Sequence, residues 1–318
     1  MLIKIYNKIT NLINDKTSRI FRVSKRELVL LKHRVFLKLK NRKLKQNSNM
    51  RLGVAYNLFD GEELLEYSIK SIRKNVDFIC VVWQKISNHG EKCNLGVEEL
   101  LNSLMSKGLV DEIYLYEPYI KITNENNASI NETNKRNIGL ELCKKNNCDY
   151  FMTIDTDEFY TDEQFRFMKN EMLSGNYGTG YCQHRQYYYD SIYQLEKPER
   201  EYISTIEKII PSTKYVYNIP CILTIDPTRK TNNVLENKLS YRVFNRKECE
   251  MHHLSFVRKD IKKKLMNSSA KRFFSEESID KINSYYKNWK YPKPCMWAGE
   301  KLLKIIKVPR QFEIYKID

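Results

Sequence analysis

Three carboxylates lie within four consecutive residues, in the segment Asp155-Thr156-Asp157-Glu158. Carboxylate oxygens are the ligands that hard cations such as Mg²⁺ and Mn²⁺ prefer, and these ions share the rest of their shell with substrate phosphates. No Lys or Arg lies between Ile154 and Gln164, so nothing within this stretch offsets the repulsion between the acids. The segment is therefore a candidate metal and phosphate site. The alternative is an acidic helix N-terminus, because acids favour that position and a helix is expected next.

The elements expected around the acidic segment place it at the edge of a sheet. Apolar runs predict strands at 52–56, 77–83, 113–116 and 150–154, and helical patterns predict helices at 62–74, 97–107 and 132–145 between them. This alternation predicts an α/β fold with a parallel, right-handed sheet. Such sheets bind ligands at the carboxyl ends of their strands, where the acidic segment lies. Farther along, strands are expected at 179–189 and 241–257 and helices at 160–174 and 275–288.

A longer stretch around the acidic segment resembles a known family. Residues 134–140 read Asn-Lys-Arg-Asn-Ile-Gly-Leu, and residues 148–159 read Cys-Asp-Tyr-Phe-Met-Thr-Ile-Asp-Thr-Asp-Glu-Phe. This order resembles the glycosyltransferases with the GT-A fold, in particular the family 2-like group, in which a Lys/Arg-Asn-x-Gly stretch leads to an apolar strand and a DxD motif. The resemblance implies sugar transfer from a nucleotide sugar, with Asp155 and Asp157 binding Mn²⁺ or Mg²⁺ and the donor diphosphate. It also implies that Lys135 and Arg136 face the donor nucleotide.

The beginning of the predicted domain is similar to the same family. Residues 54–69 look like its first strand, nucleotide-contacting loop and first helix, which implies that Asn57 and Glu62 lie near the donor. The acidic residue followed by Gly-Ser that is common in the family's second loop is missing, and residues 83–88 read Trp-Gln-Lys-Ile-Ser-Asn instead. The base of the donor is therefore left open between a UDP- and a GDP-sugar type. The resemblance covers residues 52–260.

Two adjacent histidines offer a further metal ligand. Imidazole supplements carboxylates on Mn²⁺, and several GT-A enzymes are known to take a metal ligand from a His in their C-terminal part. Because side chains alternate between faces in an extended segment, at most one of His252 and His253 reaches the metal. We predict His253; the alternative is an ordinary surface or core pair.

The departing diphosphate needs nearby cations. We predict that Arg258 covers it, with Lys262 and Lys271 as further candidates, because developing negative charge is stabilised by a fixed positive charge. The alternative for each of these residues is a solvated charge on the protein surface.

An inverting transfer also needs a carboxylate that takes the proton of the acceptor hydroxyl. We predict Asp226, because it is an isolated acid that is flanked by apolar residues and a rigid proline. Asp190 and Glu207 remain open as candidates, and Asp-Pro is equally a turn signal. Aromatic residues at 187–189 and 289–297 are either stacking faces for a saccharide acceptor or ordinary core.

The charge of the chain is concentrated at its N-terminus. Residues 1–50 hold 14 Lys or Arg against Asp15 and Glu27, and so carry +12 of the formal charge of +16. This distribution disfavours a nucleic-acid enzyme with a basic groove throughout. Residues 2–13 and 24–39 read as basic amphipathic helices, which either contact an anionic membrane surface or pack on the domain or on another copy of the chain.

The polar linker 46–49 separates this basic helical extension, residues 1–50, from a GT-A domain at 51–318. Within that domain we expect a nucleotide-sugar-binding half, 51–158, and an acceptor-binding half, 159–318, for a glycan or lipid-linked acceptor. No apolar run of about 18 residues and no signal peptide is found, so a cytoplasmic protein, peripheral at the cytosolic face of a membrane, is expected.

Two other functions fit parts of the sequence. A nucleotidyltransferase on a similar sheet would also use paired acids and a metal, but no Gly-rich phosphate loop follows the first predicted strand. A non-catalytic adaptor would bind a membrane or nucleic acid through residues 1–50, but it would not need Lys135 or the acidic segment. The eight cysteines form no CxxC pair and read as free thiols.

Overall fold

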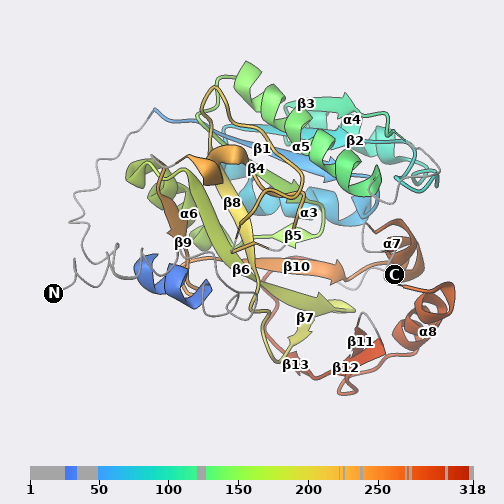
Figure 1. Ribbon diagram of the computed structural model, residues 1–318. Helices are drawn as coiled ribbons and strands as arrows, with labels where there is room; N and C mark the ends of the chain where they lie inside the picture. Colours follow the sequence, from blue (N-terminus) through green and yellow to red (C-terminus); the bar gives the residue numbers. More distant parts are fainter. Residues whose placement is uncertain are drawn as a thin grey trace.

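The computed structural model describes residues 26–33, 49–119 and 127–314, with gaps at 222, 225, 237–238, 269–270, 272–273 and 298–299. Within these residues, eleven strands form one central sheet that helices cover (Figure 1). The first half runs in the order β1 (Leu52–Leu58), α3 (Glu62–Ile72), η2 (Arg73–Asn75), β2 (Phe78–Trp83), α4 (Val97–Ser106), β3 (Glu112–Leu115), α5 (Asn127–Lys145) and β4 (Tyr150–Asp155). The predicted α/β fold is confirmed.

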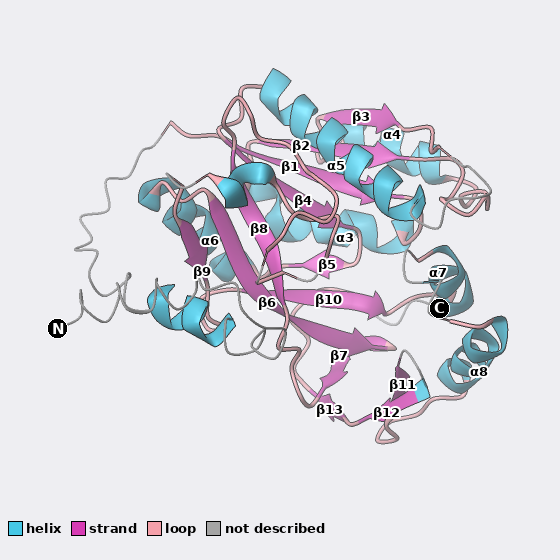
Figure 2. Ribbon diagram, viewed as in Figure 1, coloured by secondary structure: helices cyan, strands magenta, loops and turns pink. Residues whose placement is uncertain are grey.

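The strands of this half are parallel, as the alternation predicts. β1 lies between β2 and β4, with Ala55 beside Cys80 on one side and beside Thr153 on the other, and β3 pairs with the outer edge of β2. β1, β2 and β4 are almost continuously buried because helices cover both faces of the sheet (Figure 2). The α3 and α4 helices pack on one face and α5 packs on the other.

A glycine brings α5 close to the sheet. A Cβ atom at Gly139 would lie 2.4 Å from the Cβ of Ala55, so a larger residue would push the helix away. Residues 132, 136, 139 and 143 recur at helical spacing on this side of α5. Cys143 packs against Gly53 at the start of β1, so the charged residues Glu132 and Arg136 lie toward the carboxyl ends of the strands.

The second half extends the same sheet with mixed directions. It contains β5 (Glu158–Phe159), α6 (Asp162–Gly175), β6 (Thr179–Tyr188), β7 (Asp190–Leu195), β8 (Tyr202–Lys208), η3 (Asn232–Leu235), β9 (Tyr241–Val243) and β10 (Glu250–Phe256). β8 is antiparallel to β4, and β6 is antiparallel to β8. β10 lies between β6 and β5, with His253 paired to Glu158. Because of this pairing, β10 lies beside the acidic segment, residues 155–158.

The C-terminal part packs on β6, β7 and β10. It contains α7 (Ile261–Asn267), α8 (Glu276–Lys287), β11 (Cys295–Trp297), β12 (Lys301–Leu303) and β13 (Ile305–Lys307). The aromatic residues considered for sugar stacking mostly form core here, since Tyr187, Tyr188 and Trp289 are buried. Tyr291 is 44% exposed and stacks on Tyr193 with a ring separation of 5.3 Å.

Part of the N-terminal extension is helical and packs on the domain. Residues 26–33 form a helix whose Val29 and Leu30 are buried against β6, β8 and β9. Leu31 of the same helix is 43% exposed. The helix at 2–13, the rest of the helix at 24–39 and most of the linker lie outside the described residues. No helix that the structure describes is both long and apolar enough to cross a membrane.

Candidate active site

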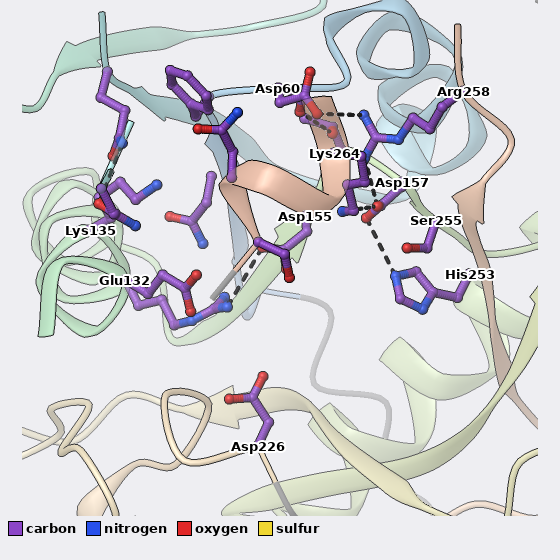
Figure 3. Close-up of a pocket in the computed structure, with 18 residues that line it drawn as sticks. Asp60, Glu132, Lys135, Asp155, Asp157, Asp226, His253, Ser255, Arg258 and Lys264 are labelled. Carbon is purple, nitrogen blue, oxygen red and sulfur yellow. Dashed lines mark hydrogen bonds and ion pairs between the residues drawn. The ribbon is translucent and has the colours of Figure 1, made fainter. Parts of the chain in front are cut away.

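A cavity of about 280 Å³ opens at the carboxyl ends of β1, β2 and β4 (Figure 3). α5 forms one side of it, and β10 and α7 form another. The predicted site residues that line this cavity are Asn57, Lys135, Arg136, Asp155, Asp157, Asp226, His253 and Arg258. Glu62 was also predicted but does not line it; this carboxylate accepts a hydrogen bond from Asn94 at the rim.

Asp155, the last residue of β4, lies between two guanidinium groups. Its Oδ2 is 2.6 Å from Nη2 of Arg229, and its Oδ1 is 3.6 Å from Nη2 of Arg136. Burial alone would raise the pKa of Asp155, but the Arg229 and Arg136 guanidinium groups hold that pKa well below its usual range. The carboxylate is therefore charged and already balanced by the protein's own cations.

Asp157 is buried and lies among three positively charged or basic groups. Its Oδ2 accepts hydrogen bonds from Nη2 of Arg258 at 2.7 Å and from Nζ of Lys264 at 2.8 Å. Its Oδ1 lies 3.6 Å from Nε2 of His253. Burial would raise the pKa of Asp157, but Lys264, Arg258 and His253 together lower it well below its ordinary value. Arg258 and Lys264 both remain at the edge of the cavity, where they can meet a second anion.

Glu158, the third acid, is neutralised by the side chain of Arg229. The two guanidinium nitrogens lie 2.5 and 2.9 Å from the carboxylate oxygens, and both side chains are only 4% exposed. Burial raises the pKa of Glu158, and Arg229 partly offsets this effect. The local sequence suggested unbalanced repulsion between the acids, but residues distant in the chain supply the missing positive charge.

Oδ1 of Asp157 and Nε2 of His253 lie 3.6 Å apart, and both residues line the cavity. Among the described residues, no group of three or more His, Cys, Asp or Glu side chains is arranged to hold a metal. A carboxylate oxygen and an imidazole nitrogen are ligand types that Mn²⁺ accepts, so Asp157 and His253 are the residues that would hold such an ion.

The two histidines point to opposite faces of β10, as the alternation predicts. His253 lines the cavity, whereas His252 is buried behind it with its Nδ1 2.9 Å from the hydroxyl of Tyr187. Phe312 packs edge-on against the His252 ring. Burial lowers the pKa of His252 to about 4, so this imidazole is neutral at physiological pH.

Asp226 lies on the cavity wall across from Asp155 (Figure 3). Its Oδ1 accepts hydrogen bonds from the backbone N–H and the hydroxyl of Thr228, both at 2.8 Å, which is the geometry of an Asx turn. Its Oδ2 is 3.3 Å from Nε of Arg229. Asp226 therefore forms the turn that its Asp-Pro sequence suggested and also faces the cavity.

The other two candidate acids do not line the cavity. Asp190 forms an ion pair with Arg310 at 2.9 Å. Glu207 is opposite Phe151 near the start of β4, and its carboxylate accepts hydrogen bonds from the hydroxyls of Thr179 and Thr231.

Arg258 is held beside the loop after β1. Its guanidinium lies against Gly61, where an added Cβ would be 1.6 Å from Nη1, and its Nη1 is 3.9 Å from Asp60. Of the other predicted cations, Lys262 pairs with Asp280 on the surface, and Lys271 does not line the cavity. Lys264 instead reaches the acidic segment, one helical turn from the N-terminus of α7.

Several cavity residues were not identified from the sequence, namely Arg229 behind the acids and Gln84, Glu132 and Lys264 on the wall. Arg229 follows Asp226 by three residues, and this short distance from a predicted site residue was the only sequence feature that pointed to Arg229. Burial lowers the pKa of Lys135 to about 8, because the ammonium group loses water inside the cavity and the charges of Glu132 and Asp155 only partly compensate.

Comparisons with known proteins find similar solved structures at low sequence identity. No family model matches the sequence, and no curated protein matches it. Among solved structures, S. aureus TarS 1-349 matches with a TM-score of 0.40 and 10% identity, over 75% of this chain and 71% of that one. TarS 1-349 in complex with UDP matches with a TM-score of 0.39 and 11% identity, over 75% and 71% of the two chains. The complex with UDP-GlcNAc gives 0.39 and 10%, over 75% and 72%. The chemistry of the site is therefore argued from its own residues.

Proposed function

We propose that this protein is a glycosyltransferase that moves a sugar from a nucleotide sugar to a saccharide or lipid-linked acceptor. The observation that carries the proposal is the group formed by Asp157, His253, Arg258 and Lys264 at the carboxyl edge of a parallel sheet. Two fixed cations beside a carboxylate–imidazole pair suit a diphosphate, which needs positive charge on several oxygens at once.

The cations would act mainly on the leaving group. When the bond between the sugar and the diphosphate breaks, negative charge grows on the diphosphate oxygens, and Arg258 and Lys264 would offset it. Both are held by Asp157 beforehand, so little reorganisation is needed. A bound Mn²⁺ or Mg²⁺ would supply further positive charge to the same oxygens. Asp157 and His253 would hold this ion. We keep Asp155 as a further proposed ligand, although the Arg229 guanidinium balances its charge.

We assign the proton acceptor of an inverting transfer to Asp226. This carboxylate faces the cavity across from Asp155, and its hydrogen bonds from Thr228 fix its orientation. A positioned carboxylate can take the proton of the acceptor hydroxyl as that oxygen attacks the sugar. We assign the acceptor to residues 159–318 and nucleotide binding to residues 51–158, and we keep membrane contact as the role proposed for the N-terminal extension, residues 1–50.

The proposal is tested by turnover of a panel of UDP- and GDP-sugars that includes UDP-GlcNAc. Nucleoside diphosphate release is measured with Mn²⁺, with Mg²⁺ and with a chelator. The wild type is compared with Asp157→Asn and with Glu163→Gln, which removes an exposed carboxylate six residues away. We expect metal-dependent release from one donor class, lost in Asp157→Asn and kept in Glu163→Gln. Absence of release and of nucleotide binding for every donor would overturn the proposal.

A further inference from the structure

Three hydrogen-bond acceptors without partners line the end of the cavity where α5 passes over β1 and β2. The side-chain oxygens of Asn57 and Gln84 are buried and accept no hydrogen bond from any described residue. The amide nitrogen of Gln84 donates to the carbonyl of Ile86 at 2.8 Å, which leaves the oxygen as its unused end. The Glu132 carboxylate lines the same cavity and forms neither a hydrogen bond nor an ion pair with the described residues.

The fold brings these acceptors to one place. Asn57 lies beside Val82 in the register of β1 and β2, so Gln84, two residues farther on, points to the same face of the sheet. That face carries α5, and Glu132 precedes Arg136 by one turn on the side of this helix that lines the cavity. Arg136 and Asn57 both donate to the hydroxyl of Thr153, which joins the helix to the strand ends.

The unpartnered oxygens of Asn57 and Gln84 are buried, and the Glu132 side chain is half-buried beside them. Burial raises the pKa of Glu132, and the nearby Asp226 and Asp155 add to this effect while Arg136 and Lys135 oppose it. A buried polar group that loses its hydrogen bonds to water is destabilising unless another donor replaces them. The missing donors are O–H or N–H groups, because the amide oxygens of Asn57 and Gln84 and the carboxylate of Glu132 all accept hydrogen bonds.

The rest of the cavity indicates which part of a ligand supplies the O–H and N–H donors. Under the proposed function, on which this inference rests, the diphosphate lies at Asp157, Arg258 and Lys264. Glu132 lies on the other side of Asp155 from these cations (Figure 3). A nucleoside joined to that diphosphate can reach this end of the cavity, and its ribose carries two adjacent hydroxyls. A carboxylate with two free oxygens suits such a diol, and acidic residues bind the ribose 2′-hydroxyl in dinucleotide sites.

We propose that Glu132 is a specificity-determining residue that accepts hydrogen bonds from the ribose hydroxyls, so that the site selects ribonucleotides over 2′-deoxyribonucleotides. The amide oxygens of Asn57 and Gln84 accept N–H groups of the base. No carboxylate at position 132 is needed for the fold, because its side chain has no partner to lose.

Binding of UDP and 2′-deoxy-UDP by titration calorimetry tests this role, with GDP and 2′-deoxy-GDP as a second pair. The wild type is compared with Glu132→Ala and Glu132→Gln, and thermal unfolding checks that each variant is folded. Glu141→Gln is the matched control, because Glu141 lies on the same helix and pairs with Lys144 on the surface. A hydrogen bond to a charged group changes affinity by roughly 10- to 100-fold.

We expect the wild type and Glu141→Gln to bind the ribonucleotide at least about tenfold more tightly than its 2′-deoxy form. In Glu132→Ala this ratio should fall to near one, because the ribonucleotide loses the contact of its 2′-hydroxyl in addition to that of the 3′-hydroxyl, which both nucleotides share; Glu132→Gln should lie in between. Equal losses for both nucleotides, or an unchanged ratio in both variants, would overturn the role of Glu132 and leave the proposed function standing. Failure of the wild type to bind any of the four nucleotides would overturn both.

Discussion

Replacing Arg229 with Met should destabilise the protein more than most single substitutions. The Arg229 guanidinium is 4% exposed and lies 2.6 Å from Asp155 and 2.5 Å from Glu158. The Met side chain retains much of the volume but leaves two carboxylates without their main counter-ion. Removing one partner of a buried ion pair is destabilising by about 3–5 kcal/mol, because the remaining charge is uncompensated. We expect a loss of this size in the free energy of unfolding at pH 8.

The loss should shrink at lower pH. Without Arg229, burial dominates the pKa of Glu158, which should rise further in the folded variant, whereas Asp155 is 38% exposed and keeps Arg136. A folded-state pKa above the unfolded value favours the protonated folded form, so the variant regains stability as the pH falls toward that of the unfolded carboxyl groups. Each unit of pKa change corresponds to about 1.4 kcal/mol. The deficit relative to wild type should therefore be smaller at pH 5 than at pH 8 by at least about 1 kcal/mol.

Urea unfolding followed by circular dichroism at the two pH values measures this difference. Arg242→Met is the control, because Arg242 is also buried and pairs with Glu171 and Glu248 outside the cavity. Both variants should lose stability, but only Arg229→Met should also weaken nucleotide binding. A deficit for Arg229→Met below about 1 kcal/mol, or one that does not change with pH, would refute the role assigned to Arg229.

Three further predictions follow from other parts of the structure. Gly61→Ala should weaken UDP binding in calorimetry by about tenfold or more, because the new Cβ displaces the Arg258 guanidinium. The same substitution should reduce the free energy of unfolding by only about 1–2 kcal/mol, which is the cost of placing Ala at a φ of 84°. Unchanged affinity would contradict the placement of Arg258. Burial raises the pKa of Glu207 to about 8, so its stabilising contribution is complete below pH 4.5 and declines as the pH rises to 8. Glu207→Gln should flatten this decline in urea unfolding, and an unchanged slope would argue against a protonated Glu207. Deletion of residues 1–25 should abolish co-sedimentation with phosphatidylserine vesicles, whereas equal sedimentation of both proteins would exclude this segment as the membrane contact.

The strands of the first half were predictable because each is a short, continuous apolar run. Residues 150–154 are buried on both faces of the sheet, so they read as a strand without any alternation. The later strands were less predictable. β7 and β8 carry polar residues such as Gln194 and Glu207 in buried positions, so these strands do not read as continuous apolar runs. The side of the helix at 26–33 that faces the domain could not be predicted, because β6 and β9, which it packs against, are distant in sequence.

The acidic segment could be found from local sequence, but its environment could not. Asp155 and Arg229 are 74 residues apart, and Asp157 and Lys264 are 107 apart. Nothing in a single sequence indicates that such residues meet. The contact between Asp157 and Lys264, for example, depends on how β10 and α7 return to the end of β4. Glu132 was missed for a different reason: its charge sits within an ordinary polar stretch of helix, and only the packing of Gly139 on Ala55 shows which side faces the cavity.

The identity of the products from a cleaved nucleotide sugar tests the proposed function most directly. The protein is incubated with the donor identified in the turnover panel and with Mn²⁺ in H₂¹⁸O, and the products are analysed by mass spectrometry. Glycosyl transfer to water should give the nucleoside diphosphate without label and the free sugar with ¹⁸O at its anomeric carbon. A nucleoside monophosphate together with a sugar 1-phosphate would instead show attack on phosphorus and would contradict a glycosyltransferase.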